Sequence, residues 1–267
     1  MMMEMDLLTQ ERQTYIHKCL QREGRVIAAD LAESLNVSVD TIRRDLRDMA
    51  SLGLCQRVYG GALPPAPKEA NFLGRQSIMP ERKVALAAAT IDFLQPGMHV
   101  FIDAGTTNLA IAQAIPGDMA LTVLTNAPSI AAALLDHDAC QIVVLGGQVD
   151  KQIGAAVGAR TVREIEALNA DLAILGTCGF DVINGLSAHT LEESEVKRAM
   201  AMRSRVTMAA LTNDKLETAA NYNILPSQAC GRLILEFDSP EPARRDISAL
   251  GIDLVVANRP ASAQESI

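Results

Sequence analysis

The sequence predicts two domains of different class, a small α+β domain at residues 1–61 and a larger α/β domain with a mainly parallel sheet at residues 72–267. Three observations predict this division. Helical periodicity with short connections runs from residue 9 to residue 52, and a glycine-containing hairpin pattern follows it. A proline-rich stretch comes next, and beyond it short apolar runs alternate with helical segments.

Composition limits the kinds of function that fit. Hydrophobic residues make up 49% of the 267, which is enough for a sizeable buried core. Aromatic residues make up only 3%, which argues against a single-stranded nucleic-acid surface built on base stacking. The net charge of −8 disfavours nonspecific nucleic-acid binding. Any contact with DNA would therefore need a local basic patch, and residues 1–70 carry nearly balanced charge.

The N-terminal residues, the apolar stretches and the cysteines suggest a cytoplasmic protein. Acidic residues stand near the N-terminus, where a secretory signal would carry basic ones, and the longest apolar stretch contains Asp92. The five cysteines are far apart and form no C-x-x-C pair, so we expect reduced, mostly buried thiols. No cofactor, metal site or membrane contact is expected.

The first two helices are expected at 9–23 and 28–35. Ile16 and Leu20 lie on one face of the first, and Gly24 ends it. Leu31 and Leu35 take the same i, i+4 relation in the second.

The third helix is expected to begin after Ser38, a good N-cap, and to end near residue 52. Its sequence begins within "VSVDTIRRDL", residues 37–46. At 100° per residue, Ile42, Leu46 and Met49 share one side, whereas Arg44 points almost the opposite way. The helix should therefore bury one side and expose a polar face centred on Arg44.

The next ten residues, "LCQRVYGGAL", contain the pair Gly60–Gly61 and predict a β-hairpin, or wing. Two helices joined by a tight turn, the second with an exposed polar face, form a helix-turn-helix. Arginine on such a face can donate two hydrogen bonds to guanine in the major groove of double-stranded DNA. The alternative is a solvated helix face on which Arg43 or Arg44 pairs with Asp40, Asp45 or Asp48.

Residues 62–71, "ALPPAPKEAN", are expected to form a linker because prolines remove backbone donors and fix φ. After it, near-continuous apolar runs predict buried parallel strands with helical crossovers. The strands are expected at 99–103, 120–124, 141–145, 172–176, 205–211, 232–236 and 253–257. The helices are expected at 82–94, 107–115, 128–137, 159–169, 191–203 and 242–250.

Small polar residues and glycines follow most of these strands, where open α/β sheets bind ligands. In "DAGTTN", residues 103–108, Gly105 permits close approach, and Thr106 and Thr107 offer hydroxyls and amides at a helix start. This suits a phosphate or a carboxylate, to which Lys215 can add a point charge. Each motif taken alone is an ordinary turn, cap or surface lysine. "TLEE", residues 190–193, is interpreted as a purely structural capping box.

The N-terminal motifs resemble the winged helix of the DeoR-type bacterial transcription regulators. "VSVDTIRRDL" followed by "LCQRVYGGA" carries the resemblance, which runs from about residue 12 to residue 62. It implies that one set of residues lies at DNA and that the wing lies near the DNA backbone. The implied contacts are Ser38, Thr41, Arg43 and Arg44 in the helix, and Arg57, Gly60 and Gly61 in the wing.

The resemblance continues through "DAGTTN", "TNAPSIA", "VVLGG", "AILGTCGFD", "GLSAHTLEESEVKRAM" and "NDK", in family order. It implies a sensor domain similar in fold to ribose-phosphate isomerases, with a phosphorylated sugar as ligand. The implied ligand residues are Asp103, Gly105, Thr106, Thr107, Asn126, Gly146, Gly147 and Lys215. One departure is "LTNDK", in which Thr212 stands where the family commonly has Asp.

The expected function is therefore a sequence-specific transcription regulator that is not an enzyme. By the habit of the family it would repress a carbohydrate-metabolism operon and be released by a phosphorylated sugar or sugar acid. It would act as a homo-oligomer, a dimer or a tetramer. The alternative is a sugar-phosphate isomerase-like enzyme with a DNA-binding appendage, for which Asp103, Asp181 and Glu192 are the candidate bases.

Overall fold

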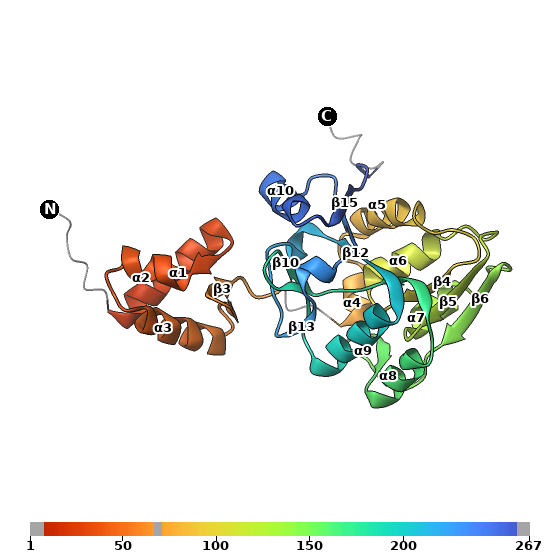
Figure 1. Cartoon of the computed structure of the whole chain (residues 1–267), viewed down its shortest axis with the longest axis horizontal. Helices are drawn as coiled ribbons and strands as arrows, with labels where there is room; N and C mark the ends of the chain where they lie inside the picture. The colour runs from red at the N-terminus through yellow and green to blue at the C-terminus, as the bar shows by residue number, and fades with distance from the viewer. Residues whose placement is uncertain (1–7, 67–70, 261–267) are drawn as a thin grey trace.

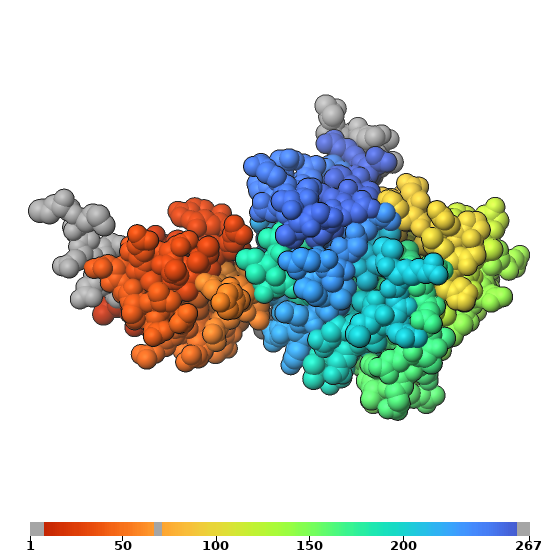
Figure 2. Space-filling model, in the orientation of Figure 1, coloured from red at the N-terminus to blue at the C-terminus, as the bar shows by residue number. Residues whose placement is uncertain are grey.

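The computed structural model describes residues 8–66 and 71–260, arranged as two lobes (Figure 1). Figure 2 shows the smaller lobe, in red and orange, beside the larger lobe, whose colours run from yellow to blue. None of the helices in the described ranges combines the length and hydrophobicity needed to span a bilayer.

The smaller lobe is a winged helix, as the sequence predicts. A three-stranded antiparallel sheet in the order β1-β3-β2 packs against its helices. The elements are α1 (Thr9–Glu23), β1 (Val26–Ile27), α2 (Ala28–Ser34), α3 (Val39–Ser51), β2 (Gln56–Val58) and β3 (Gly61–Leu63). Strand β1 was not predicted, since two residues are too short to show a period. The core contains Ile16, Leu20, Ile42, Leu46 and Met49, as expected.

Local chemistry explains the ends of these elements. Gly24 takes a left-handed conformation with φ 70° and closes α1. The Ser38 hydroxyl accepts a hydrogen bond of 3.1 Å from the amide of Thr41 and begins α3. A Cβ atom on Gly61 would lie 1.9 Å from the carbonyl oxygen of Val26, so only glycine lets β1 pair with β3.

The larger lobe contains a seven-stranded parallel sheet in the order β15-β14-β12-β9-β4-β5-β6. All seven predicted strands belong to it, with ends shifted by one or two residues. They are β4 (His99–Ile102), β5 (Leu121–Thr125), β6 (Cys140–Val144), β9 (Ala170–Ile174), β12 (Ser204–Leu211), β14 (Arg232–Leu235) and β15 (Asp253–Val256).

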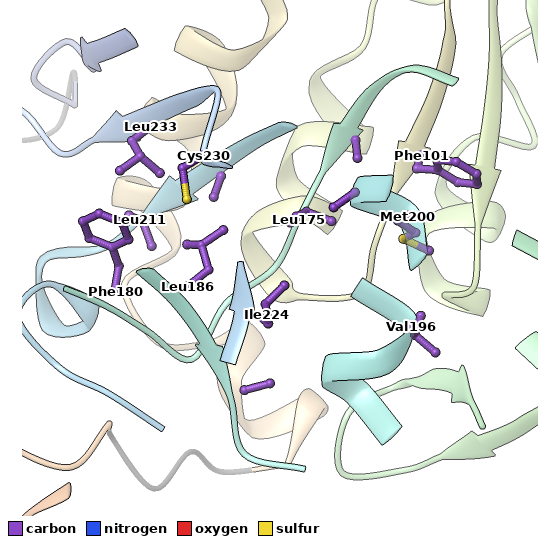
Figure 3. Close-up of a cluster of buried hydrophobic side chains, with 14 of the residues drawn as sticks. Phe101, Leu175, Phe180, Leu186, Val196, Met200, Leu211, Ile224, Cys230 and Leu233 are labelled. Atoms are coloured by element: carbon purple, nitrogen blue, oxygen red, sulfur yellow. The ribbon is translucent and has the colours of Figure 1, made fainter. Parts of the chain in front are cut away.

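The predicted helices cover both faces of this sheet. They are α5 (Pro80–Ile91), α6 (Thr106–Ala114), α7 (Pro128–Ala133), α8 (Ala159–Glu166), α9 (Leu191–Met202) and α10 (Glu241–Ala249). Side chains of α5, α6 and α7 share one buried cluster with Val100 and Ile102 of β4. Those of α8, α9 and α10 share the other with Phe101 of the same strand (Figure 3). Successive residues of a strand face opposite ways, so strands covered on both faces read as continuous apolar runs.

Several short elements were not predicted. They are α4 (Phe72–Gln76), β7 (Gln148–Asp150), β8 (Ala155–Val157), β10 (Gly179–Asp181), β11 (Gly185–Ala188), β13 (Tyr222–Leu225) and the 3₁₀ turns η1 (Asn213–Lys215) and η2 (Ser227–Ala229). The strands form antiparallel pairs, one sheet in the order β10-β11-β13 and one hairpin of β7 with β8. Three- and four-residue strands rich in small side chains carry too few alternations to be distinguished from loops.

The connection between the lobes differs from a plain linker. Strand β3 continues through Ala62 and Leu63, two residues into the range expected for the linker. The amide of Ala66 then donates a 2.9 Å hydrogen bond to the carbonyl oxygen of Ala219, so the chain docks on the larger lobe. Residues 67–70 of the expected linker lie outside the described residues.

Candidate DNA-binding surface and effector pocket

The exposed face of α3 carries the arginines that the sequence singled out. Arg43 and Arg44 are both exposed. Arg43 forms a 3.1 Å ion pair with Asp40, whose side chain is 86% exposed, so this pair is weak and exchangeable. Within the described ranges, Arg44 has no hydrogen-bond or ion-pair partner. The alternative of a solvated ion pair therefore describes Arg43 but not Arg44.

The beginning of α3 adds hydroxyls and free amides to this face. Ser38 Oγ, which caps the helix, also lies 2.8 Å from Thr41 Oγ1. The first amides of a helix lack partners within it and give its N-terminus a partial positive charge. This end of α3 is therefore suited to a phosphate beside the arginine face.

Asp45, a candidate partner of the arginines, is instead buried against α1. Its carboxylate accepts hydrogen bonds from Arg12 Nε at 2.5 Å and Arg12 Nη2 at 3.1 Å. The hydrogen bond to Asp45 raises the pKa of Arg12 against the opposing effect of burial. This pair fastens α3 to α1. Sequence reasoning missed it because the two residues are 33 positions apart.

The wing presents Arg57 on β2 and a turn at Gly60, which has φ 83°. Tyr59 stands 95% exposed at the tip, and the sequence analysis did not select it. Arg57 and Tyr59 line an open hollow whose opposite side includes Arg198 and Tyr222 of the larger lobe. The wing thus lies beside the larger lobe.

The second candidate site is a pocket at the carboxyl edge of the parallel sheet. Strand order reverses between β4, which leads outward to β5 and β6, and β9, which leads the other way to β12. The loops that follow β4 and β9 diverge at this point and leave a crevice, the usual ligand site of such sheets. Its lining residues are Arg75, Ala104, Gly105, Thr106, Thr107, Asn108, Ile153, Gly176, Thr177, Cys178, Glu193, Lys197, Ala210 and Lys215.

Close approach of two loops shapes the floor of the pocket. Gly105 precedes α6 with φ 142°, and its Cβ position lies 4.0 Å from Gly176. A Cβ atom on Gly176 itself would lie 2.3 Å from the carbonyl oxygen of Ala104. The amides of Thr106 and Thr107 begin the nine-residue α6 and have no acceptor within it. This geometry suits an anion, as predicted for these three residues.

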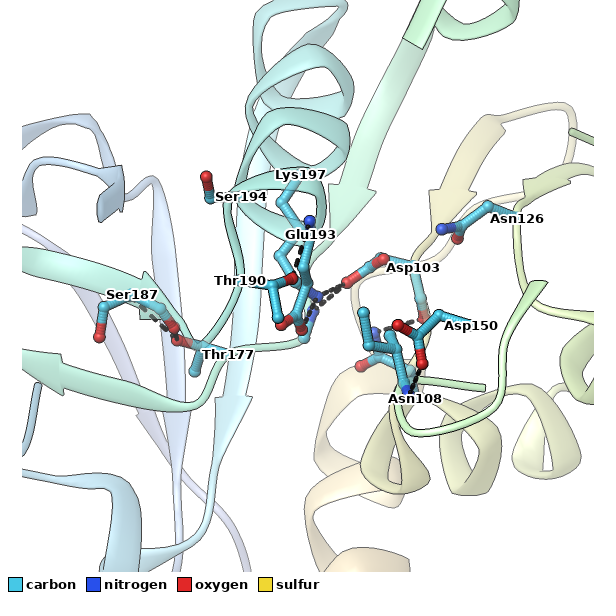
Figure 4. A network of polar contacts seen from close by, with 12 residues as sticks. Asp103, Asn108, Asn126, Asp150, Thr177, Ser187, Thr190, Glu193, Ser194 and Lys197 are labelled. Atoms are coloured by element: carbon cyan, nitrogen blue, oxygen red, sulfur yellow. Dashed lines mark hydrogen bonds and ion pairs between the residues drawn. The ribbon is translucent and has the colours of Figure 1, made fainter. Parts of the chain in front are cut away.

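Asp103 lies behind the lining rather than in it. Its buried carboxylate forms an ion pair with Lys197 and accepts a 3.0 Å hydrogen bond from the amide of Gly176 (Figure 4). Lys197 Nζ also lies 3.3 Å from Glu193 Oε1. Burial would lower the pKa of Lys197, but attraction to Asp103 and Glu193 outweighs burial and raises it. Lys197 is therefore a buried cation at neutral pH.

Lys215 reaches the pocket from the turn after β12. Its Nζ donates a 2.8 Å hydrogen bond to the carbonyl oxygen of Thr177. The turn is held by Glu236, which accepts a 3.0 Å bond from the amide of Asn213 and a 2.7 Å bond from Arg82. Thr212, the departure from the family pattern, is buried and outside the lining.

Three predicted ligand residues lie elsewhere on the same edge. Asn126 follows β5 and donates a 2.9 Å bond to the carbonyl oxygen of Ala156. The Gly146 amide donates to Glu164 at 2.5 Å, and a Cβ on Gly147 would lie 2.3 Å from Thr161 Oγ1. These contacts are those of turn and strand-end residues. They follow β5 and β6, the strands farther from the point where strand order reverses.

Sequence reasoning missed three charged residues of the pocket: Arg75, Glu193 and Lys197. Arg75 lies on the unpredicted α4. The i, i+4 spacing of Glu193 and Lys197 indicates an ion pair but not its place in the fold. In "TLEE", Thr190 caps α9 by accepting from the Glu193 amide at 3.3 Å, as predicted, and Glu193 also lines the pocket.

The enclosed space is about 30 Å³, room for a water molecule or two but not for a sugar phosphate. A larger ligand therefore requires the pocket to widen. The described residues contain no group of three or more His, Cys, Asp and Glu side chains that could hold a metal ion.

Comparison with known proteins places both lobes. Residues 12–67 match the DeoR-like helix-turn-helix domain, and residues 78–236 match the DeoR C terminal sensor domain. The chain is 32% identical over 249 residues to the uncharacterized HTH-type transcriptional regulator YgbI of Escherichia coli, covering 92% of this chain and 97% of that protein.

A second similar protein is the glycerol-3-phosphate regulon repressor of E. coli, 30% identical over 215 residues that cover 80% of this chain and 85% of the repressor. Among solved structures, the sorbitol operon regulator SorC of Klebsiella pneumoniae aligns with a TM-score of 0.41 at 12% identity. The alignment covers 90% of this chain and 98% of SorC.

Proposed function

Because this chain belongs to the DeoR family of transcription regulators, we propose that it is a sequence-specific DNA-binding repressor of a carbohydrate-metabolism operon, released by a small phosphorylated effector. One observation carries the proposal. Helix α3 exposes Arg44, which has no partner among the described residues. A separate pocket combines the amides at the start of α6 with Lys197 and Lys215, which suit an anion.

The DNA-binding part of the proposal assigns α3 to the major groove. Arg44 contacts a base edge, for which guanine offers two acceptors. Arg43, Ser38 and Thr41 contact neighbouring phosphates or bases. In the wing, Arg57 approaches the DNA backbone and the glycines Gly60 and Gly61 permit the tight turn. The exposure of the two arginines supports this assignment.

Two copies are needed to read two half-sites in successive major grooves, so the protein acts as a homo-oligomer, a dimer or a tetramer. It acts in the cytoplasm, together with the operator DNA that it binds. Nearly balanced charge in residues 1–70 leaves the basic face of α3 to attract DNA, whereas the net charge of −8 limits binding elsewhere.

The effector part assigns the phosphate to the amides of Gly105, Thr106 and Thr107, with Lys215 as a counter-charge. Asp103 holds the pocket from behind through Lys197. Asn126, Gly146 and Gly147 shape the adjoining edge. To admit the effector, Lys215 exchanges its bond to Thr177 for the phosphate. The name of the glycerol-3-phosphate regulon repressor supports a phosphorylated carbohydrate as the class of ligand.

The chain between the lobes offers a short route from pocket to DNA. Ala66 packs in a buried cluster with Cys178 and Ala220, and Cys178 lines the pocket. The stretch after Lys215 reaches Ala219, which accepts the hydrogen bond from Ala66. A shift of Lys215 or of the Thr177–Cys178 loop therefore moves the residues that Ala66 contacts, Cys178 and Ala219. Effector and DNA then weaken each other's binding reciprocally, by about 1–3 kcal/mol.

The isomerase-like alternative has less support. Asp181 accepts hydrogen bonds from the amides of Ile183 and Asn184, and Glu192 is exposed outside the pocket lining. Asp103 is held in its ion pair with Lys197. The relatives are named as transcription regulators. Isomerisation of a bound sugar phosphate, followed by NMR, would contradict the assignment as a regulator without catalysis.

Thr106→Asp tests the proposed function. A carboxylate at the start of α6 repels phosphate, so we expect the variant to bind operator DNA normally and to lose release by the effector. The operator is first selected from genomic fragments with the purified protein, and release is measured by fluorescence anisotropy against sugar phosphates. Thr106→Ser, which keeps the hydroxyl, is the control. If the effector still releases Thr106→Asp from the operator normally, the effector phosphate does not bind in this pocket.

A further inference from the structure

We propose that Glu193 and Lys197 make the pocket selective for effectors that present a neutral hydroxyl, so that sugar or polyol phosphates bind and phosphorylated sugar acids are rejected. The inference rests on the proposed function, since it concerns the part of the effector beyond the phosphate that Gly105, Thr106 and Thr107 are proposed to hold. It assigns specificity to two residues that lie far in sequence from these three.

Lys197 has one donor left for a ligand. Its ammonium group carries three N–H bonds. It is buried, with its side chain 1% exposed, and lines the pocket. Among the described residues, Asp103 and Glu193 are its ion-pair partners. The third N–H bond can be donated to an oxygen atom inside the pocket.

The carboxylate of Glu193, next to Lys197, can also accept a hydrogen bond from a ligand. In a full capping box, the side chain of this residue would bond back to the amide of Thr190. Within the described residues α9 shows only the other half, in which Thr190 Oγ1 accepts from the Glu193 amide. The Glu193 carboxylate instead turns to Lys197 and the pocket, with its side chain 12% exposed (Figure 4).

Two sets of charged groups meet at the pocket. Arg75, Lys215 and the start of α6 contribute positive charge to the lining. Lys197 stands instead between two carboxyl groups, those of Asp103 and Glu193. A phosphate fits the first set, whereas a second anion placed beside Lys197 would also meet the Glu193 carboxylate.

A hydroxyl matches the pair of Glu193 and Lys197 because it both donates and accepts hydrogen bonds. It can donate a hydrogen bond to the Glu193 carboxylate and accept one from the remaining N–H of Lys197. A carboxylate at the same place has no proton to donate and lies against the like charge of Glu193, which weakens its binding. The pair therefore separates ligands that share a phosphate and a chain length but differ in their oxidation state.

The test uses matched probes in isothermal titration with the full-length protein. The pairs are glycerol 3-phosphate with 3-phosphoglycerate, ribose 5-phosphate with 5-phosphoribonate, and glucose 6-phosphate with 6-phosphogluconate, with inorganic phosphate as the common part. For at least one pair we expect the sugar or polyol phosphate to bind at least about tenfold more tightly than the corresponding phosphorylated acid.

Glu193→Gln keeps the size and an acceptor oxygen but removes the charge, so we expect the ratio within that pair to fall about tenfold. Glu192→Gln, at the exposed neighbouring position, should leave the ratio unchanged. Retained operator binding and an unchanged thermal unfolding transition show that both lobes of the variants fold.

Each remaining result counts against the inference in a distinct way. Equal affinity within every pair that binds, or a ratio unaffected by Glu193→Gln, overturns the selectivity and leaves the phosphate site standing. Preference for an acid member overturns it equally. If neither the pairs nor inorganic phosphate bind, the proposed effector class fails and the inference fails with it.

Discussion

Two neighbouring arginines on α3 have different surroundings. Arg43 already has a carboxylate at 3.1 Å, whereas Arg44 has no partner among the described residues. Binding of Arg43 to DNA must break or share that ion pair, which offsets part of its gain. Arg44 has no such ion pair to break, so all the donors of its guanidinium group can hydrogen-bond a base.

Arg44→Ala should therefore weaken binding to the selected operator by about 1–3 kcal/mol and relax sequence preference at one position. Effector binding should not change, because the pocket lies in the other lobe. Anisotropy titrations with operator variants measure both effects. The control is Arg163→Ala, an exposed arginine on α8. If Arg44→Ala and Arg163→Ala bind the operator equally well, the assignment of α3 is wrong.

At the scale of elements, the buried pair of Arg12 and Asp45 joins α1 to the recognition helix. The side chains are 11% and 2% exposed. Removing one member of a buried pair leaves the other desolvated and uncompensated. The position of α3 therefore depends on a charge that never reaches DNA.

We expect Asp45→Ala to lower the stability of the winged helix by about 3–5 kcal/mol. Amide hydrogen exchange in α1 and α3 should accelerate, while exchange in β4 of the other lobe should not. Asp48→Ala removes an exposed carboxylate from the same helix and is the matched control. Similar exchange in the two variants would show that the pair contributes little.

The predicted and observed elements differ in a regular way. Long helices with an apolar face and strands buried on both sides carry repeated signals, so all seven strands of the parallel sheet were identified. The elements that escaped are short: β1 has two residues and α4 has five. Contacts made elsewhere in the chain hold them, such as the pairing of Val26 with Ala62.

At the scale of the whole molecule, Ala66 ties the chain between the lobes to the larger lobe. Ala66 is 4% exposed and packs against Cys178 in the wall of the candidate effector pocket. Occupancy of the pocket and placement of the winged helix therefore share a contact. Such a shared element can carry a coupling free energy between two sites.

Ala66→Pro should uncouple the lobes, because proline cannot donate the hydrogen bond to Ala219. Operator binding without effector and effector binding without operator should each persist. The loss of operator affinity caused by a saturating effector should shrink by about tenfold. Ala66→Ser keeps the donor and should behave as the natural protein. An unchanged effector response in Ala66→Pro would place the coupling elsewhere.

The sequence by itself determined the two domain classes, the exposed face of α3 and the position of α6, at whose start we propose that an anion binds. These depend on local periodicity, caps and glycines, which neighbouring residues suffice to specify. Only the tertiary structure decided which strand ends meet. The reversal of strand order between β4 and β9 brings Gly105, Thr106, Thr107 and Lys215 together with Lys197, and leaves Asn126, Gly146 and Gly147 outside. Adjacency in a parallel sheet follows from the packing of whole elements, and no short stretch of sequence encodes it.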